Sequence, residues 1–325
     1  MAESDDGSVA VPAVDWSVAA GVGRRLVPAG PELSRDEASD VVAELRSSAD
    51  RATDAVAAAS GLAVPPSTET LVLDRAGWVS AVVSMTEAML LTIGQTPPAT
   101  LGEKVSGRLA GAQLGSALAF VATRILGQYD PYSPVPRLLL VAPNIVAAER
   151  SMAVEPRGFR QWVCLHEQTH RFQFGAAPWL AVHLLSLLRD VFDDAGERSG
   201  RLRLLSVPQA AALDRVTAVM SLLEGHADVV MDSAADPLVP QAALLRQRFE
   251  GRRDAGGLIQ VLSRILGLQA KREQYLHGAR FCRAVIAEAG VDGLNLAFRA
   301  PELLPTLDEL HNPAGWLRRV PQRVG

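Results

Sequence analysis

The sequence predicts an α+β protein that is predominantly helical, with a small sheet and an N-terminal helical part. Three observations support this prediction. Apolar residues recur at the spacing of helices through most of the chain. One short apolar run, over residues 137–145, is bounded by prolines and is typical of a buried strand. An H-E-x-x-H motif at His166, Glu167 and His170 lies inside one of the helical segments.

Helical segments follow one another along the chain. Residues 1–12 are polar and predict a disordered tail, and the helical pattern begins at Asp15. Ser34 with Glu37 three residues later is a capping box, which predicts that a helix starts there. Further helices are expected over residues 75–93, 109–121, 180–191 and 262–289.

The run over residues 109–121 is the most apolar stretch of the chain. A membrane helix needs about 20 such residues, whereas this run is cut short by Arg108 and Arg124. Gly111 and Gly115 are four apart, so they share one helix face. We therefore expect a buried helix that approaches another helix closely.

Length and composition suit a soluble globular protein. With 325 residues, of which 48% are hydrophobic and 21% charged, the chain can form one large domain or two small ones. A proline-rich connector over residues 129–136 predicts a boundary between an N-terminal helical part, residues 13–133, and a metal-binding part, residues 134–325. We expect the two parts to form one compact unit.

Charge and cysteine content exclude several classes of function. The net charge of −4 gives no basic surface for nucleic acid or anionic lipid, so neither nucleic acid nor a membrane is expected as a partner. Two cysteines are too few for a cysteine-rich zinc module or a disulfide framework. The first eight residues are acidic and polar, unlike a secretory signal, which predicts a cytoplasmic protein.

The H-E-x-x-H motif predicts a metal site. On a helix, His166 and His170 lie one above the other, so both rings can bind one ion. Glu167 lies about 100° around the helix, where it can take a proton from a zinc-bound water as a general base. The alternative is a pair of hydrogen-bonded core histidines, which would be costly to bury beside a glutamate without a metal.

A third ligand is expected from residues 219–231. This helical run is apolar on most of its surface but carries Glu224 and Asp228 four apart on one face. Glu224 as a ligand, with Asp228 accepting the free ring N–H of a ligand histidine, would give both carboxylates a partner. His226 lies about 200° around the helix from Glu224, so we interpret it as a packing or hydrogen-bonding residue.

These motifs resemble a known family. H-E-x-x-H followed by E-x-x-x-D resembles the gluzincin branch of zinc metallopeptidases. The phrases at residues 165–175, 221–228 and 271–275 are more closely similar to a bacterial zincin-like family of hydrolases with unassigned function, sometimes labelled as associated with deazaflavin-cofactor biosynthesis. The resemblance extends from about Asp15 to Trp316. It implies a zincin-like metalloprotease fold that binds zinc through His166, His170 and Glu224.

The resemblance also implies two residues that contact substrate. In zincins a strand before the first motif forms a wall of the cleft, so the strand over 137–145 could receive an extended peptide near Asn144. A plain structural strand is the alternative. Tyr275, in the third shared phrase, is the candidate donor to the oxyanion of the reaction. A core tyrosine is the alternative.

Two functions are consistent with the sequence. The first is a zinc-dependent hydrolase, a metallopeptidase that uses a zinc-bound water activated by Glu167, with an unidentified peptide or small molecule as substrate. The second is a non-catalytic zincin-fold binding or scaffold protein with a structural or vestigial metal site. The glutamate beside the ligands favours the hydrolase, because a structural metal site has no use for a base.

Overall fold

The computed structural model describes residues 13–66, 68–92, 100–192, 207–235, 238–240, 242–252 and 276–320. The tail predicted over residues 1–12 lies outside these ranges. The helices before the motif are α1 (Trp16–Leu26), α2 (Arg35–Ser60), α3 (Arg75–Thr92), α4 (Leu101–Val121) and α5 (Ala142–Met152). The later helices are α6 (Pro156–Ala176), α7 (Leu180–Phe192), α8 (Val207–Ala235), α9 (Ala242–Arg252), α11 (Leu276–Asn295), α12 (Leu307–His311) and α13 (Pro313–Arg319). Short 3-10 turns, η3 (Leu296–Phe298) and η4 (Pro301–Leu303), follow α11.

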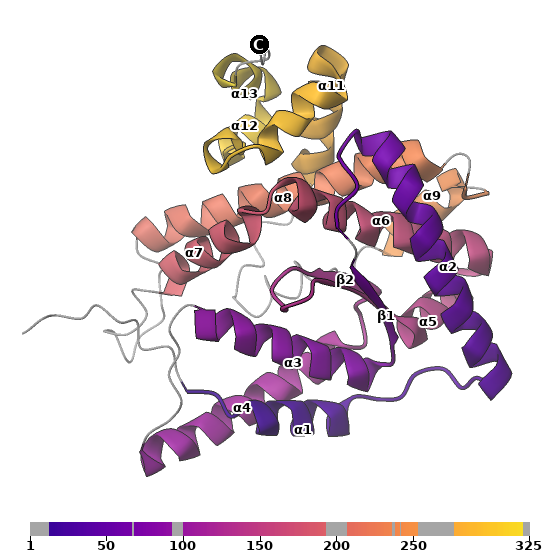
Figure 1. The fold of residues 1–325 in the computed structure, drawn as a ribbon, viewed down its shortest axis with the longest axis vertical. Coiled ribbons are helices and arrows are strands. Elements are labelled where there is room, and N and C mark those ends of the chain that lie inside the picture. Colours follow the sequence, from indigo (N-terminus) through magenta and orange to yellow (C-terminus); the bar gives the residue numbers. More distant parts are fainter. Residues whose placement is uncertain are drawn as a thin grey trace, which may run out of the picture.

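A three-stranded sheet lies at the centre of the described fold (Figure 1). Its strands are β1 (Glu69–Leu73), β2 (Gly127–Asp130) and β3 (Arg137–Val141), in the order β1-β3-β2. β1 pairs with β3 in parallel, and β2 pairs with β3 antiparallel. The predominantly helical α+β fold with a small sheet is therefore confirmed.

Two details of the predicted strand region are wrong. β3 ends at Val141 rather than at residue 145, because the backbone turns directly into α5 with Pro143 in its first turn. The connector predicted from residue 129 begins inside β2, which the sequence did not indicate. Asp130 then shapes the turn, since its carboxylate accepts from the N–H groups of Tyr132 and Ser133 and pairs with Arg137. The predicted boundary at residue 133 thus falls inside a β-hairpin.

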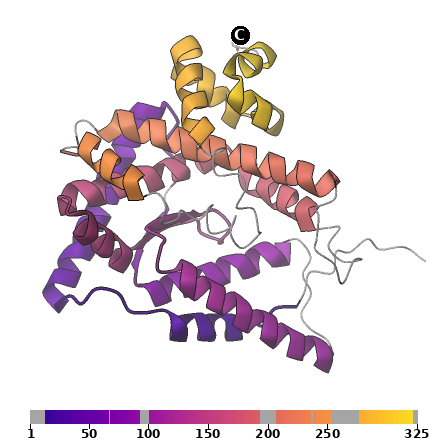
Figure 2. The same cartoon turned by 180° about the vertical axis from the view of Figure 1, so that it is seen from behind.

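Both faces of the sheet are covered by helices, which are seen from two sides in Figures 1 and 2. Leu139 and Val141 of β3 face a core with α1, α3 and α4. Leu138 and Leu140, on the opposite face, join a core with α2, α5, α6 and α8. This alternation is the period of two expected of a strand. A third core joins α7 and α8 to α11, α12 and α13.

The predicted close helix contact is present between α1 and α4. A Cβ atom at Gly111 would collide with the carbonyl oxygen of Asp15, and one at Gly115 with that of Ala19. The two glycines therefore let the helix backbones touch. The capping box predicted at Ser34 and Glu37 is also confirmed, at the start of α2.

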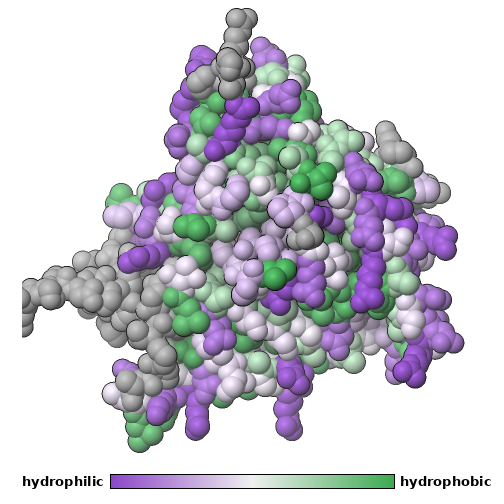
Figure 3. Space-filling model, in the orientation of Figure 1, coloured by the Kyte–Doolittle hydropathy of each residue, from purple (hydrophilic) through white to green (hydrophobic). Residues whose placement is uncertain are grey.

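Hydrophobic and hydrophilic side chains are interspersed over the face shown in Figure 3. Among the exposed apolar side chains are Leu101, Val105 and Leu109, which share one face of α4. Within the described ranges, no helix is both long enough and apolar enough to span a bilayer.

Candidate metal centre

Helix α6 carries the H-E-x-x-H motif, as predicted. Its start is fixed by Glu155, whose carboxylate accepts hydrogen bonds from the backbone N–H groups of Arg157 and Gly158 at 2.9 and 2.6 Å. Pro156 occupies the first helical position, where a missing N–H is tolerated. The helix continues to Ala176, so His166 and His170 lie one turn apart on one face.

Two buried glutamines mark the face of α6 that packs on α2. The side-chain amides of Gln161 and Gln168 donate to the carbonyl oxygens of Ser48 and Ala49 on α2, at 3.2 and 2.9 Å. His170 lies about 200° around the helix from Gln168. The face that carries the histidines is therefore turned away from α2 and toward α8.

Three predicted ligands converge at this face. The Nε2 atoms of His166 and His170 are 3.2 Å apart. The carboxylate oxygens of Glu224, on α8, lie 3.6 Å from Nε2 of His166 and 3.7 Å from Nε2 of His170. One donor atom from each residue lies within 4.8 Å of the others. The side chain of Glu224 is 35% exposed, so the centre is accessible from solvent.

Glu167 lies beside these three residues without joining their donor set. Its side chain is 7% exposed and contacts the backbone of Gly127, the first residue of β2, where a Cβ atom would lie 2.6 Å from Cγ of the glutamate. Burial, with a smaller contribution from the charge of Glu224, raises the pKa of Glu167 to about 8. A carboxyl group with a raised pKa is suited to accept and release a proton near neutral pH.

The donor set fits zinc. Two neutral imidazole nitrogens and one carboxylate are the ligands that catalytic zinc sites commonly use, with a further position left open. The negative charge of Glu224 also adds to the raised pKa of Glu167, and a bound cation would offset that charge. These properties favour a divalent cation over an unoccupied histidine pair.

Gln173 is a residue of the site that motif reasoning missed. It is fully buried on α6, and its Oε1 lies 2.9 Å from Nδ1 of His170. Its Nε2 lies 2.7 Å from the carbonyl oxygen of Leu223 and 3.0 Å from Nδ1 of His226. The signal that could have identified it is its spacing, since residues three apart on a helix are neighbours.

His226 is a hydrogen-bonding and packing residue, as predicted. Its side chain is 1% exposed, and its ring packs edge-on against Phe298 with the centroids 5.0 Å apart. Burial, with a smaller contribution from the charge of His170, lowers the pKa of His226 to about 3. The ring is therefore neutral at physiological pH.

Asp228 lies one turn after Glu224 on α8 and is half-buried. Burial raises the pKa of Cys282 on α11, and the negative charge of Asp228 adds to this rise. The carboxylate of Asp228 is therefore near that helix. The sequence predicts that Asp228 accepts a hydrogen bond from a ligand histidine, but Nδ1 of His170 contacts Gln173 instead. A contact between Asp228 and the ring of His166 stays a prediction.

Asn144 does not lie at a strand edge. It belongs to α5, is 4% exposed, and donates its side-chain amide to the carbonyl oxygens of Ala122 and Ile125 at 2.7 and 2.6 Å. Its Oδ1 accepts from Arg75. These three contacts give it a structural role that ties α5 to α3 and to the end of α4. Tyr275 lies outside the described residues, so its predicted role as a donor stays a prediction.

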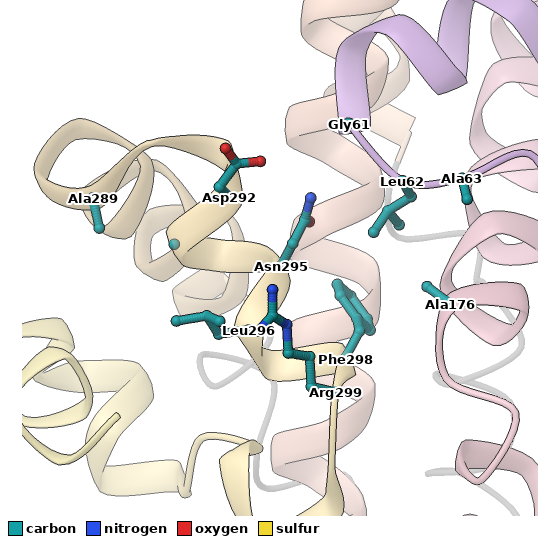
Figure 4. A pocket seen from close by; sticks show the side chains of 11 residues that line it. Gly61, Leu62, Ala63, Ala176, Ala289, Asp292, Asn295, Leu296, Phe298 and Arg299 are labelled. Carbon is teal, nitrogen blue, oxygen red and sulfur yellow. The ribbon is translucent and has the colours of Figure 1, made fainter. Parts of the chain in front are cut away.

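A cavity of about 470 Å³ lies away from the donor atoms, between the ends of α2 and α6 on one side and the end of α11 with the turn that follows it on the other (Figure 4). Asp292, Asn295 and Arg299 supply its polar lining, and Leu62, Leu296 and Phe298 supply apolar surface. None of the three predicted ligands lines it. The cavity is therefore separate from the predicted ligands on α6 and α8.

Comparisons with known proteins agree with this geometry. A model of the family described as zincin-like metallopeptidases matches residues 14–317. A crystal structure of a "putative hydrolase with a novel fold" from Chloroflexus aurantiacus is 30% identical, covers 96% of this chain and 100% of its own, and superposes with a TM-score of 0.75. No curated protein matches the chain. Both likenesses support a hydrolase, and the match over residues 14–317 shows that the chain belongs to the zincin-like metallopeptidase family.

Proposed function

We propose that this protein is a zinc-dependent hydrolase that cleaves peptide bonds, with Glu167 as its general base. The observation that carries the proposal is the placement of Glu167 beside the converging side chains of His166, His170 and Glu224 but outside their donor set. A structural zinc site needs ligands only, and it gains nothing from a buried carboxylate next to them. Membership of the zincin-like metallopeptidase family adds support.

Each residue of the centre has a role in this proposal. His166 and His170 offer Nε2 lone pairs, and Glu224 adds a negative charge, so together they would hold one cation. When bound, zinc supplies positive charge that polarises a scissile carbonyl and acidifies water. Glu167 takes the proton of the attacking water and delivers it to the leaving amine.

The position of β2 supports a peptide as the substrate class. This strand is at the edge of the described sheet, and its first residue, Gly127, contacts the side chain of Glu167. Edge strands can pair with an extended peptide through backbone hydrogen bonds. A peptide paired with β2 would pass beside the proposed base, which supports a peptide substrate over a small one. In this proposal the peptide docks on the backbone of β2 and not near Asn144.

Tyr275 stays our proposed donor to the oxyanion. Gly278, three residues later in the sequence, packs so closely on α8 that a Cβ atom there would collide with the carbonyl oxygen of Ser221, and a Cβ atom at Gly225 would collide with the carbonyl carbon of Gly278. The described start of α11 is therefore adjacent to Glu224. This neighbourhood supports Tyr275, because an oxyanion donor must act close to the metal ligands.

The proposal is tested with the full chain loaded with zinc. Elemental analysis should give about one zinc per chain, because the donor set offers three ligands, and Glu224→Ala should lose most of it. Digestion of an unbiased peptide library, read by mass spectrometry, should give new termini with the loaded protein and none after chelation or with Glu224→Ala. A loaded wild-type protein that cleaves neither the library nor an ester panel would overturn the proposal and leave a binding or scaffold role.

A further inference from the structure

A buried amide joins the two helices that carry the predicted ligands. Gln173 on α6 has no solvent exposure, and its two ends contact different partners. The Oε1 end is 2.9 Å from Nδ1 of His170, and the Nε2 end is 2.7 Å from the carbonyl oxygen of Leu223 on α8. Leu223 directly precedes Glu224 in the sequence. One side chain thus contacts a ligand histidine and the backbone next to the ligand glutamate.

The partners of Gln173 determine which way its amide points. A backbone carbonyl can only accept a hydrogen bond, so the group that contacts Leu223 must be the NH₂ of the amide. The oxygen of the amide therefore lies on the side of His170. Because an amide oxygen can only accept, Nδ1 of His170 must carry a proton and donate it.

This hydrogen bond selects the form of His170 that can bind a metal. In a neutral imidazole with its proton on Nδ1, the lone pair is on Nε2. Nε2 of His170 is the atom that faces Nε2 of His166, at 3.2 Å, and the carboxylate of Glu224, at 3.7 Å. The opposite tautomer would direct an N–H into the donor set and could not be a ligand there.

His226 completes the network from the other side. The second hydrogen of the Gln173 amide is directed at Nδ1 of His226, which must accept it, at 3.0 Å. The ring is held in place by the edge-on contact with Phe298. Both hydrogens and the oxygen of the amide are thus used, which prevents the amide from flipping.

We propose that Gln173 is the positioning residue of the metal centre: it fixes His170 as its Nδ1–H tautomer and ties that ligand to the helix that carries Glu224. The inference rests on the metal centre of the proposed function and assigns the outer support of His170 to an amide. Such outer contacts typically change metal affinity by about 10–100-fold.

The test compares three variants of the full chain. Gln173→Met removes both hydrogen-bonding ends at similar size. Gln173→Glu keeps an acceptor for His170 and loses the donors to Leu223 and His226. Gln168→Met is the matched control, since Gln168 is a buried glutamine of the same helix that contacts α2 and not the metal centre.

Two readouts distinguish positioning from a merely structural role. The tautomer of His170 is read by two-bond ¹H–¹⁵N NMR of the metal-free protein. The spectra are recorded at a pH about two units above ~6.5, the ordinary histidine pKa. The variant His170→Gln assigns the signal. Zinc affinity is measured by competition with a chelating dye. We expect the Nδ1–H tautomer in the wild type, Gln173→Glu and Gln168→Met. In Gln173→Met we expect a mixture of tautomers and zinc binding weaker by about 10–100-fold.

The outcomes separate this inference from the hydrolase proposal. A wild-type His170 with its proton on Nε2, or wild-type zinc affinity in Gln173→Met, would overturn the inference even if Gln173→Glu failed to fold. An equal loss of affinity in Gln168→Met would also overturn it, because the effect would then come from helix packing. If the expected tautomers and affinities are found but no substrate is cleaved, the hydrolase proposal fails and the role of Gln173 stands.

Discussion

Gly127 of β2 packs directly against Glu167 of α6: a Cβ atom at Gly127 would lie 2.6 Å from Cγ, 2.7 Å from Cδ and 2.9 Å from Oε1 of the glutamate. Real Cβ atoms do not approach other atoms so closely. The glycine therefore leaves the space that the carboxylate occupies, and the sheet sets the position of the proposed base. Sequence reasoning treated these two segments separately, whereas the structure brings them into contact.

The first prediction tests this contact. Gly127→Ala should displace the carboxylate of Glu167 while leaving the three ligands in place, so hydrolysis should fall at least about 10-fold with zinc content near the wild-type value. The added methyl group should also lower the free energy of unfolding by about 1–3 kcal/mol, the usual cost of overpacking. Peptide cleavage rates and zinc analysis on the same sample provide the measurement.

Gly21→Ala is the control for that experiment. A Cβ atom at Gly21 of α1 would meet nothing within 4 Å, so this variant should be as stable as the wild type or slightly more stable, with unchanged hydrolysis. Full activity in Gly127→Ala would show that the position of Glu167 does not depend on β2.

A second prediction concerns Asp228. If its carboxylate accepts from the ring of His166, Asp228→Asn should keep the fold and weaken zinc binding by about 10–100-fold. The measurement is the same dye competition that is applied to Gln173→Met. Identical zinc affinity in Asp228→Asn and wild type would leave Gln173 as the outer support for the described ligands and remove Asp228 from the metal centre.

The third prediction addresses the opposite side of the sheet. A Cβ atom at Gly115 would collide with the carbonyl oxygen of Ala19 and lie 2.9 Å from the backbone nitrogen of Gly23. Gly115→Ala should therefore separate α1 from α4 and lower the free energy of unfolding by about 1–3 kcal/mol. Denaturant unfolding measures this change. Zinc affinity should not change, because α1 and α4 join a different core from α6.

Gly102→Ala is the matched control on α4. Nothing lies within 4 Å of a Cβ atom at Gly102, so its unfolding free energy should stay near that of the wild type. If Gly115→Ala were equally stable, the two helices would not be in the close contact that the structure describes.

Local patterns predicted helix starts and the helical context of the motif correctly where the signal was contained in one segment. The capping box at Ser34 and the H-E-x-x-H motif each depend on residues within one helix, and both lie where the sequence placed them. The close approach at Gly111 was also readable, because small residues four apart share a helix face.

Features that depend on pairing between distant segments were not predicted. β1 and β2 are short, and what makes them strands is their hydrogen bonding to β3 on both sides. Asn144 follows an apolar run, but its side chain is used by contacts with Ala122 and Ile125 that no local pattern shows. The role of Gln173 likewise depends on Leu223, fifty residues away in the chain.

The central claim is that Glu167 is a base and not a ligand, and the most direct test is a comparison of Glu167→Gln with the wild type. Glutamine keeps the size of the side chain and cannot accept the proton, so zinc content and melting temperature should stay close to the wild-type values. The rate of peptide cleavage should fall by about 10²–10⁴-fold, the usual contribution of a positioned general base. Cleavage at the wild-type rate by zinc-loaded Glu167→Gln would contradict the account.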